Sequence, residues 1–104
     1  MTVELDSLSY DCAEPLRVAT FWAAVLGLTP ADPGDGSVRL DGEHEDQRVW
    51  VDPVPEPKTV KHRVHLDVDV GDPDGLEELG ATVLRPPGDD RTWWVMADVE
   101  GGEF

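Results

Sequence analysis

Apolar and polar residues alternate with a period of two in several short segments of this chain. The longest of these segments is HRVHLDVDV, residues 62–70, in which the apolar side chains share one face and His65, Asp67 and Asp69 share the other. Because successive side chains of a strand point to opposite faces, this pattern predicts a strand with one polar face. Further strands are predicted at residues 3–10, 37–40, 48–52, 82–85 and 91–99.

A helical period replaces the alternation between Leu16 and Leu26, where apolar residues recur every three or four positions. Pro15 suits the first turn of a helix, since its missing N–H would have no partner there, and Gly27 suits the left-handed position after the last turn. The segment therefore predicts an amphipathic helix with Trp22 on its buried side.

A second, shorter helix is predicted in GDPDGLEELGA, with Asp72 as its N-cap. Both helices end in the same dipeptide, Leu26-Gly27 and Leu79-Gly80, and each is preceded by a predicted strand and followed by others. This repetition predicts a duplicated unit of the form strand–helix–strand–strand–strand.

Length and charge limit the functions open to the chain. Its 104 residues, 39% of them hydrophobic, can form one compact domain. The 23 acidic and 8 basic residues give a net charge of −15, which opposes binding to nucleic acid or anionic membranes because both need clustered Lys and Arg. The acidity favours solubility or, alternatively, attraction of a cationic ligand. A single cysteine, no apolar run of the ~20 residues that cross a bilayer and no secretory signal predict a cytoplasmic location.

Four stretches resemble the glyoxalase-like branch of the vicinal oxygen chelate superfamily, which includes glyoxalase I, extradiol dioxygenases and bleomycin-resistance proteins. They are DCAEPLRVATFWAAVLG, VPEPKTVKHRVHLDVDV, LGATVLR and WWVMADVEGGEF, and together they cover nearly the whole chain. The resemblance implies an α+β fold in which paired βαβββ modules form a curled, cup-shaped mixed sheet with the helices outside. One domain, residues 1–104, would comprise a first module at about residues 1–57 and a shortened second module at about residues 58–104. A homodimer is also implied.

Enzymes of this superfamily hold a divalent metal ion with side chains from four strands. The resemblance places Ser7, Asp52 and His65 at three of these positions, and the fourth falls just past Phe104, with Glu103 close to it. Serine is a poor metal ligand, whereas a catalytic zinc ion typically needs three protein ligands. We therefore expect no complete metal site and no cofactor.

The leading hypothesis for function is a small-molecule-binding protein of the glyoxalase-like family. The ligand is expected to contact Trp50, Asp52, His65 and Trp94, since an aromatic ring beside a carboxylate suits a flat or cationic molecule. Trp93 and Trp94 are consecutive, so on a strand only one of them would line the site.

Two alternatives stay open. One is a metal-dependent lyase, isomerase or dioxygenase-type enzyme in which His65, Asp52 and Glu103 hold a divalent ion. The other is a domain kept for contacts with another protein. Metal content would separate the first alternative from the leading hypothesis.

Overall fold

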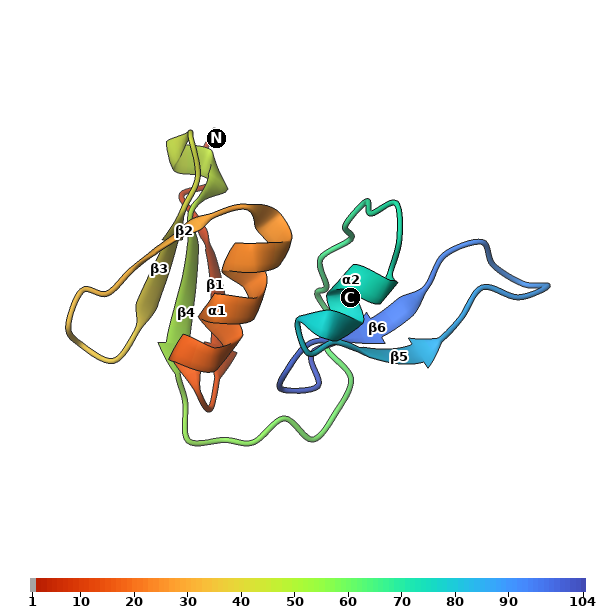
Figure 1. Ribbon diagram of the computed structural model, residues 1–104. Helices are drawn as coiled ribbons and strands as arrows, with labels where there is room; N and C mark the ends of the chain where they lie inside the picture. The colour runs from red at the N-terminus through yellow and green to blue at the C-terminus, as the bar shows by residue number, and fades with distance from the viewer. Residues whose placement is uncertain (1) are drawn as a thin grey trace. The chain divides into compact units, whose positions relative to one another are not determined.

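The computed structural model describes residues 2–104 and has the α+β fold that the sequence predicts (Figure 1). The chain forms two compact units, one that ends at Pro57 and one that comprises Lys58–Phe104. Within residues 2–104, each unit has one α-helix and its own sheet, four-stranded in the first unit and two-stranded in the second. In the described part of the chain, no helix is both long and apolar enough to cross a membrane.

The first unit contains a mixed sheet with one helix against it. Its elements are β1 (Leu8–Cys12), α1 (Pro15–Leu26), β2 (Thr29–Ala31), β3 (Val38–Asp41), the 3-10 helix η1 (Glu45–Gln47) and β4 (Val49–Pro53). The strand order is β1-β4-β3-β2, in which β1 and β4 are parallel and the other neighbours are antiparallel. The helix α1 connects β1 to β2 and packs on one face of the sheet (Figure 1).

The core of the first unit consists of apolar residues from α1 and from the sheet. The helix begins and ends at the predicted residues, and Gly27 follows it with a φ of 67°, in the left-handed region. Trp22 is buried, as predicted, and its ring contacts that of Phe21 edge-on with 5.1 Å between centroids. The buried apolar side chains are Val18, Ala19, Phe21 and Trp22 of α1 and Cys12, Val38, Leu40 and Val51 of the sheet.

The second unit contains α2 (Asp74–Glu78) and an antiparallel pair, β5 (Thr82–Arg85) and β6 (Val95–Ala97). The chain end continues this sheet, because the backbone N–H groups of Met96 and Phe104 donate to each other's carbonyl oxygens at 2.9 and 2.8 Å. Asp72, the predicted N-cap, lies one residue before the cap position, but its Oδ1 atom accepts a hydrogen bond from the first helical N–H at 3.0 Å. The buried apolar residues of this unit are Leu76, Ala81, Met96 and Ala97.

Residues 62–70 form no strand, so the clearest of the strand predictions is wrong. Alternation determines which side chains share a face, but a strand also needs a neighbour with which its backbone can form hydrogen bonds. In the first unit β4 is that neighbour for β1. Over residues 2–104, no segment pairs with residues 62–70, and the chain there is irregular.

Other strand boundaries also differ from the predictions. β1 begins at Leu8 rather than at residue 3, and β6 covers only three of the predicted residues 91–99. β2 was not predicted, since a strand of three residues is too short to show alternation. The first unit follows the order strand–helix–strand–strand–strand, whereas the second has one helix and two strands. A cup built from two equivalent modules therefore stays a prediction.

Gly80 makes the turn from α2 to β5 possible. Its φ is 112°, which residues with side chains rarely adopt, and a Cβ atom there would lie 2.8 Å from Cγ1 of Val99. We expect Gly80→Ala to lower the free energy of unfolding by about 2 kcal/mol, because both the backbone and the contact with Val99 would be strained. Urea denaturation measures this change.

Gly75→Ala is the matched control, since Gly75 lies within α2 and an added Cβ atom would have nothing within 4 Å. Alanine favours helix over glycine, so this variant should be as stable as the parent or slightly more stable. Equal losses in the two variants would contradict the role assigned to Gly80.

Candidate functional site

The second unit contains a pocket with a volume of about 570 Å³. Leu76 of α2 and Met96 of β6, both buried, form its apolar floor together with Phe104. Trp93 and Trp94 line it from the hairpin between β5 and β6, and residues of the irregular segment 62–70 form a further wall. A concave site of this size, apolar with a few polar groups, is typical of small-molecule binding.

Trp93 and Trp94 both line this pocket, so the expectation that only one of them would do so is wrong. That expectation assumed a strand, but both tryptophans precede β6. The pairing of β5 with β6 ends at Arg85 and Val95, and the chain opposite the tryptophans is Pro86-Pro87. Proline has no N–H to donate to a ladder, so the tryptophans are not held to the alternating geometry of a strand.

One wall of the pocket is acidic. His65, Asp67 and Asp69 all line it, and Nδ1 of His65 lies 3.3 Å from Oδ1 of Asp67. Asp69 makes no hydrogen bond or ion pair with any residue that the structure describes. Among the residues that the structure describes, no lysine or arginine lines the pocket. The carboxylates of this wall are exposed to water and have no lysine or arginine beside them in the lining.

Glu103 joins the two ends of the second unit. One carboxylate oxygen, Oε1, accepts a hydrogen bond from Nζ of Lys58 at 2.8 Å, and Oε2 accepts one from the backbone N–H of His62 at 2.8 Å. Burial alone would raise the pKa of this carboxyl, but the hydrogen bonds from Lys58 and His62 outweigh it and hold the pKa at about 2, below its usual 4.5. At neutral pH the carboxyl group of Glu103 is therefore ionised, and each of its oxygens accepts a hydrogen bond.

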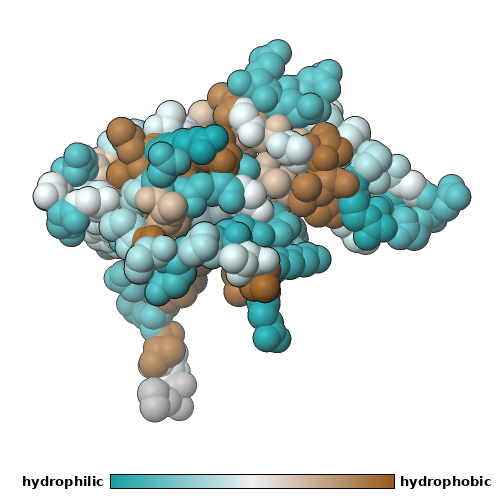
Figure 2. Space-filling model, turned by 90° about the horizontal axis from the view of Figure 1, so that it is seen from below, coloured by the Kyte–Doolittle hydropathy of each residue, from teal (hydrophilic) through white to brown (hydrophobic). Residues whose placement is uncertain are grey.

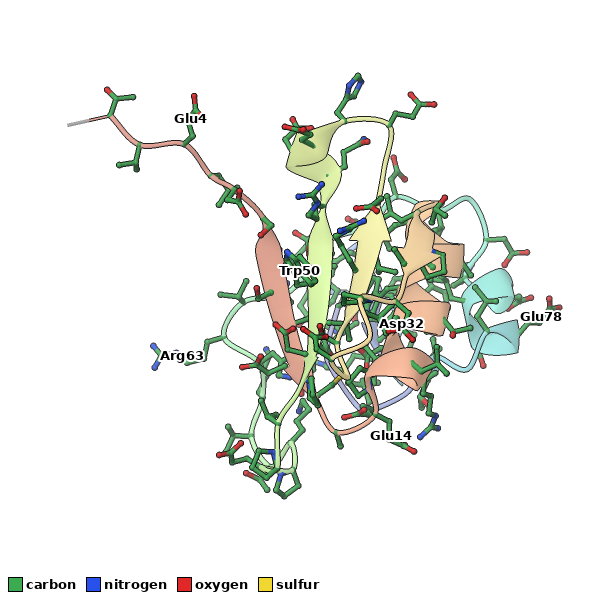
Figure 3. The ribbon with its side chains drawn as sticks, turned by 90° about the vertical axis from the view of Figure 1, so that its left-hand side faces the viewer. Glu4, Glu14, Asp32, Trp50, Arg63 and Glu78 are labelled. Atoms are coloured by element: carbon green, nitrogen blue, oxygen red, sulfur yellow. The ribbon has the colours of Figure 1, made fainter. Side chains whose placement is uncertain are left out.

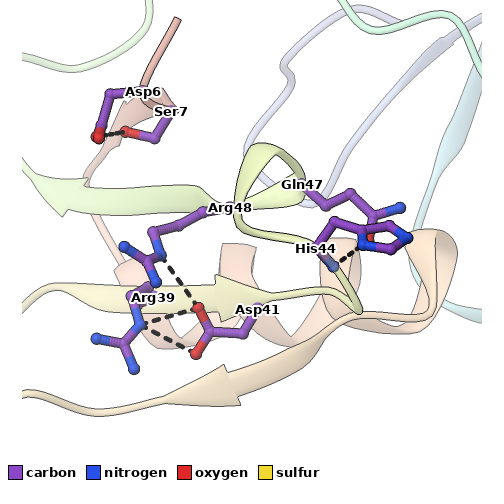
Figure 4. Close-up of polar contacts among 7 residues, drawn as sticks. All are labelled: Asp6, Ser7, Arg39, Asp41, His44, Gln47 and Arg48. Carbon is purple, nitrogen blue, oxygen red and sulfur yellow. Dashed lines mark hydrogen bonds and ion pairs between the residues drawn. The ribbon is translucent and has the colours of Figure 1, made fainter.

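Trp50 and Asp52 lie on β4 in the first unit, on the sheet face that points away from α1 (Figure 3). Arg39 lies opposite Trp50 on β3, with its guanidinium carbon 5.8 Å from the centroid of the indole ring. Asp41 pairs with Arg39 at 2.9 Å and with Arg48 at 3.4 Å, Oδ1 to Nε in both cases (Figure 4). The cationic groups on this face thus share a carboxylate of the same face.

The structure brings together some of the predicted ligand residues. His65 and Trp94 line the pocket of the second unit, and Trp50 and Asp52 share a face of β4 in the first unit. Lining residues that the sequence reasoning missed include Trp93, Met96 and Phe104. The proline pair opposite Trp93 is a signal that could have indicated it, whereas an apolar floor has no signature that distinguishes it from a core.

The residues of the alternative metal-ligand prediction come from both units, Asp52 from the first and His65 and Glu103 from the second. Over residues 2–104, no group of three or more His, Cys, Asp or Glu side chains is placed to hold one. Both oxygens of Glu103 already accept hydrogen bonds inside the second unit. The hydroxyl of Ser7 donates to the carboxylate of Asp6 at 3.0 Å (Figure 4).

These observations define an α+β protein with a pocket of small-molecule size in its second unit. The glyoxalase-like domain is the family whose pattern matches the chain, over residues 7–104. The chain therefore belongs to the glyoxalase-like domain family, within the vicinal oxygen chelate superfamily.

Solved structures with this fold include several glyoxalase-related proteins. A possible glyoxalase from Bacillus cereus has a TM-score of 0.72 and 14% identity, covering 98% of this chain and 96% of that chain. A glyoxalase/bleomycin resistance protein/dioxygenase family enzyme from Burkholderia phytofirmans PsJN has a TM-score of 0.66 and 18% identity, covering 98% and 95%. A glyoxalase-related enzyme from Fulvimarina pelagi has a TM-score of 0.61 and 14% identity, covering 96% and 84%. No curated protein matches the chain.

The engagement of Glu103 predicts a specific pH dependence of stability. Because its pKa is about 2 in the folded chain and near 4.5 when unperturbed, the carboxylate stabilises the fold above pH 4.5 and this contribution is lost as the pH falls towards 2. We expect Glu103→Gln to lower the free energy of unfolding at pH 7 by an amount on the order of 2 kcal/mol. The difference between parent and variant should shrink as the pH falls from 6 to 3.

Urea denaturation at a series of pH values measures this difference. Glu78→Gln is the control. Because Glu78 is exposed, this substitution removes the same charge without breaking a contact. If the two variants showed the same pH profile, Glu103 would have no special role in holding the unit together.

Proposed function

We propose that this chain is a small-molecule-binding protein of the glyoxalase-like domain family, with its ligand in the pocket of the second unit and no metal ion required for binding. The observation that carries the proposal is the pairing of two tryptophans with an apolar floor in a pocket of about 570 Å³. Aromatic and apolar walls of this kind supply binding energy through buried area, and a few polar groups supply orientation.

The exposure of the tryptophans supports this proposal. Trp93 and Trp94 are 62% and 42% exposed, although large aromatic side chains gain free energy when they are buried. Exposed apolar area that gathers around a concavity is typical of a binding site rather than of an inert surface. A flat ligand lying between these rings and the floor would remove that area from water.

The metal-dependent alternative is less well supported. It requires Glu103 as a ligand, but that carboxylate holds Lys58 and the His62 N–H, and taking it for a metal ion would leave both donors without this partner. Binding of a ligand without a metal ion keeps both hydrogen bonds of Glu103 in place.

The proposal predicts that Trp94→Ala weakens the binding of a flat apolar probe such as 1-methylnaphthalene. Loss of one indole contact should raise the dissociation constant roughly tenfold, because aromatic stacking together with the lost buried area accounts for about 1 to 2 kcal/mol. Two-dimensional ¹H–¹⁵N NMR measures the constant from the indole N–H signals, of which those of Trp93 and Trp94 should move. The signal of Trp22, which lies in the core of the first unit, should stay in place.

Leu79→Ala is the matched control, since Leu79 is an exposed apolar residue of the same unit that does not line the pocket. Binding that is unaffected by Trp94→Ala, or no binding by the parent protein, would overturn the proposed site. Trp50→Ala in the same titration tests whether the predicted ligand residues of the first unit contact the probe. If they do, this variant should raise the dissociation constant as Trp94→Ala does.

A further inference from the structure

We infer that the pocket of the second unit selects organic cations with a flat apolar body over neutral and anionic molecules of the same shape. This inference rests on the proposed function, since it names the class of ligand for the same pocket. It is carried by the charges that line the pocket and by the absence of a basic partner for them among the described residues.

The charge of the lining is one-sided. Asp67 and Asp69 are the two carboxylates, and His65 is the one lining residue that can gain a positive charge. The contact between Nδ1 of His65 and Oδ1 of Asp67, at 3.3 Å, involves one of the two carboxylates and leaves Asp69 without a polar contact. A cationic ligand would therefore meet negative charge that the protein itself does not neutralise, and an anionic one would be repelled.

The basic residues of this unit are engaged elsewhere or lie outside the pocket lining. Lys58 holds Glu103, and Arg85 and Arg91 both lie within ion-pair distance of Asp90 in the hairpin loop. The side chain of Arg63 extends away from the chain into solvent (Figure 3). Neither these residues nor Lys61, the remaining basic residue of the unit, lines the pocket, so none competes with a ligand for its carboxylates.

The two indole rings add to the same preference. The face of an aromatic ring carries partial negative charge, so a cation near it is attracted, most strongly when the ring is tryptophan. Trp93 and Trp94 stand on the side of the pocket formed by the hairpin, and Asp67 and Asp69 belong to segment 62–70. A flat cation could thus contact an indole face and a carboxylate in one pocket, whereas a neutral molecule would gain only the apolar contact.

The general acidity of the protein must be separated from this local effect. The net charge is −15, and hydrophilic side chains cover most of the face drawn in Figure 2, with apolar ones in smaller patches between them. Such a surface concentrates any cation weakly and without regard to its shape. A test must therefore compare ligands of equal shape, and variants of equal net charge.

Three probes of nearly the same shape meet the first requirement: 1-methylquinolinium, 1-methylnaphthalene and 1-naphthoate, which are cationic, neutral and anionic. Dissociation constants from the indole NMR signals at 20 mM and 300 mM sodium chloride would be measured for the parent protein. We expect the cation to bind roughly tenfold more tightly than the neutral probe at low salt, since cation–π attraction and one nearby carboxylate each add a few-fold. High salt should reduce this preference, and 1-naphthoate should bind most weakly.

The double variant Asp67→Asn, Asp69→Asn should lose most of the preference for the cation while it keeps its affinity for 1-methylnaphthalene. The control Glu77→Gln, Glu78→Gln removes the same charge from exposed residues of α2 that do not line the pocket, and it should keep the preference.

If the parent binds the neutral and cationic probes equally, or if the control loses the preference as fully as the pocket variant, the inference is wrong while the proposed pocket stands. If none of the probes moves the signals of Trp93 and Trp94, the proposed function itself fails.

Discussion

The arrangement of the second unit depends on the carboxylate of Glu103. Its two oxygens accept hydrogen bonds from Lys58 and from the backbone of His62, residues more than 40 positions earlier in the chain. Segment 62–70 has no strand partner among the described residues. The hydrogen bond from the N–H of His62 to Glu103 therefore holds the beginning of the segment, as the hydrogen bonds to a neighbouring strand would in a sheet. The next residue, Phe104, pairs with the backbone of Met96 and lines the pocket floor. The carboxylate of Glu103 therefore ties the beginning of the segment that forms the acidic wall to the residue that precedes Phe104 of the floor.

A second constraint acts at the other side of the pocket. A proline pair interrupts the hairpin between β5 and β6, and the tryptophans opposite it are released from the alternation of a strand. The interruption costs ladder hydrogen bonds and leaves large rings in water, both of which oppose stability. The same interruption lets two consecutive side chains line one concavity. A regular strand at this point would place one of them on the opposite face.

The sequence predicted the elements whose formation depends on local signals. The helix α1 was predicted to the residue, because Pro15 and Gly27 mark its two ends and the apolar period between them is helical. Prediction failed where structure depends on a partner far away in the chain. Residues 62–70 alternate as clearly as any strand, yet no segment of residues 2–104 pairs with them. For the candidate site, the predicted residues His65 and Trp94 lie in the pocket lining, and their contact with a ligand stays a prediction, while the apolar floor carried no sequence signal.

The carboxylates of the two units have different partners, and this difference determines where a charged ligand would gain free energy. On the polar sheet face of the first unit, Asp41 lies between two guanidinium groups, so a new ion would have to compete with existing pairs. In the second unit, Asp67 and Asp69 line the pocket from one irregular segment, and neither forms an ion pair with a lysine or arginine among the described residues. A cation bound there would not have to displace an existing ion pair with a basic side chain, so it would lose less free energy than on the sheet face of the first unit.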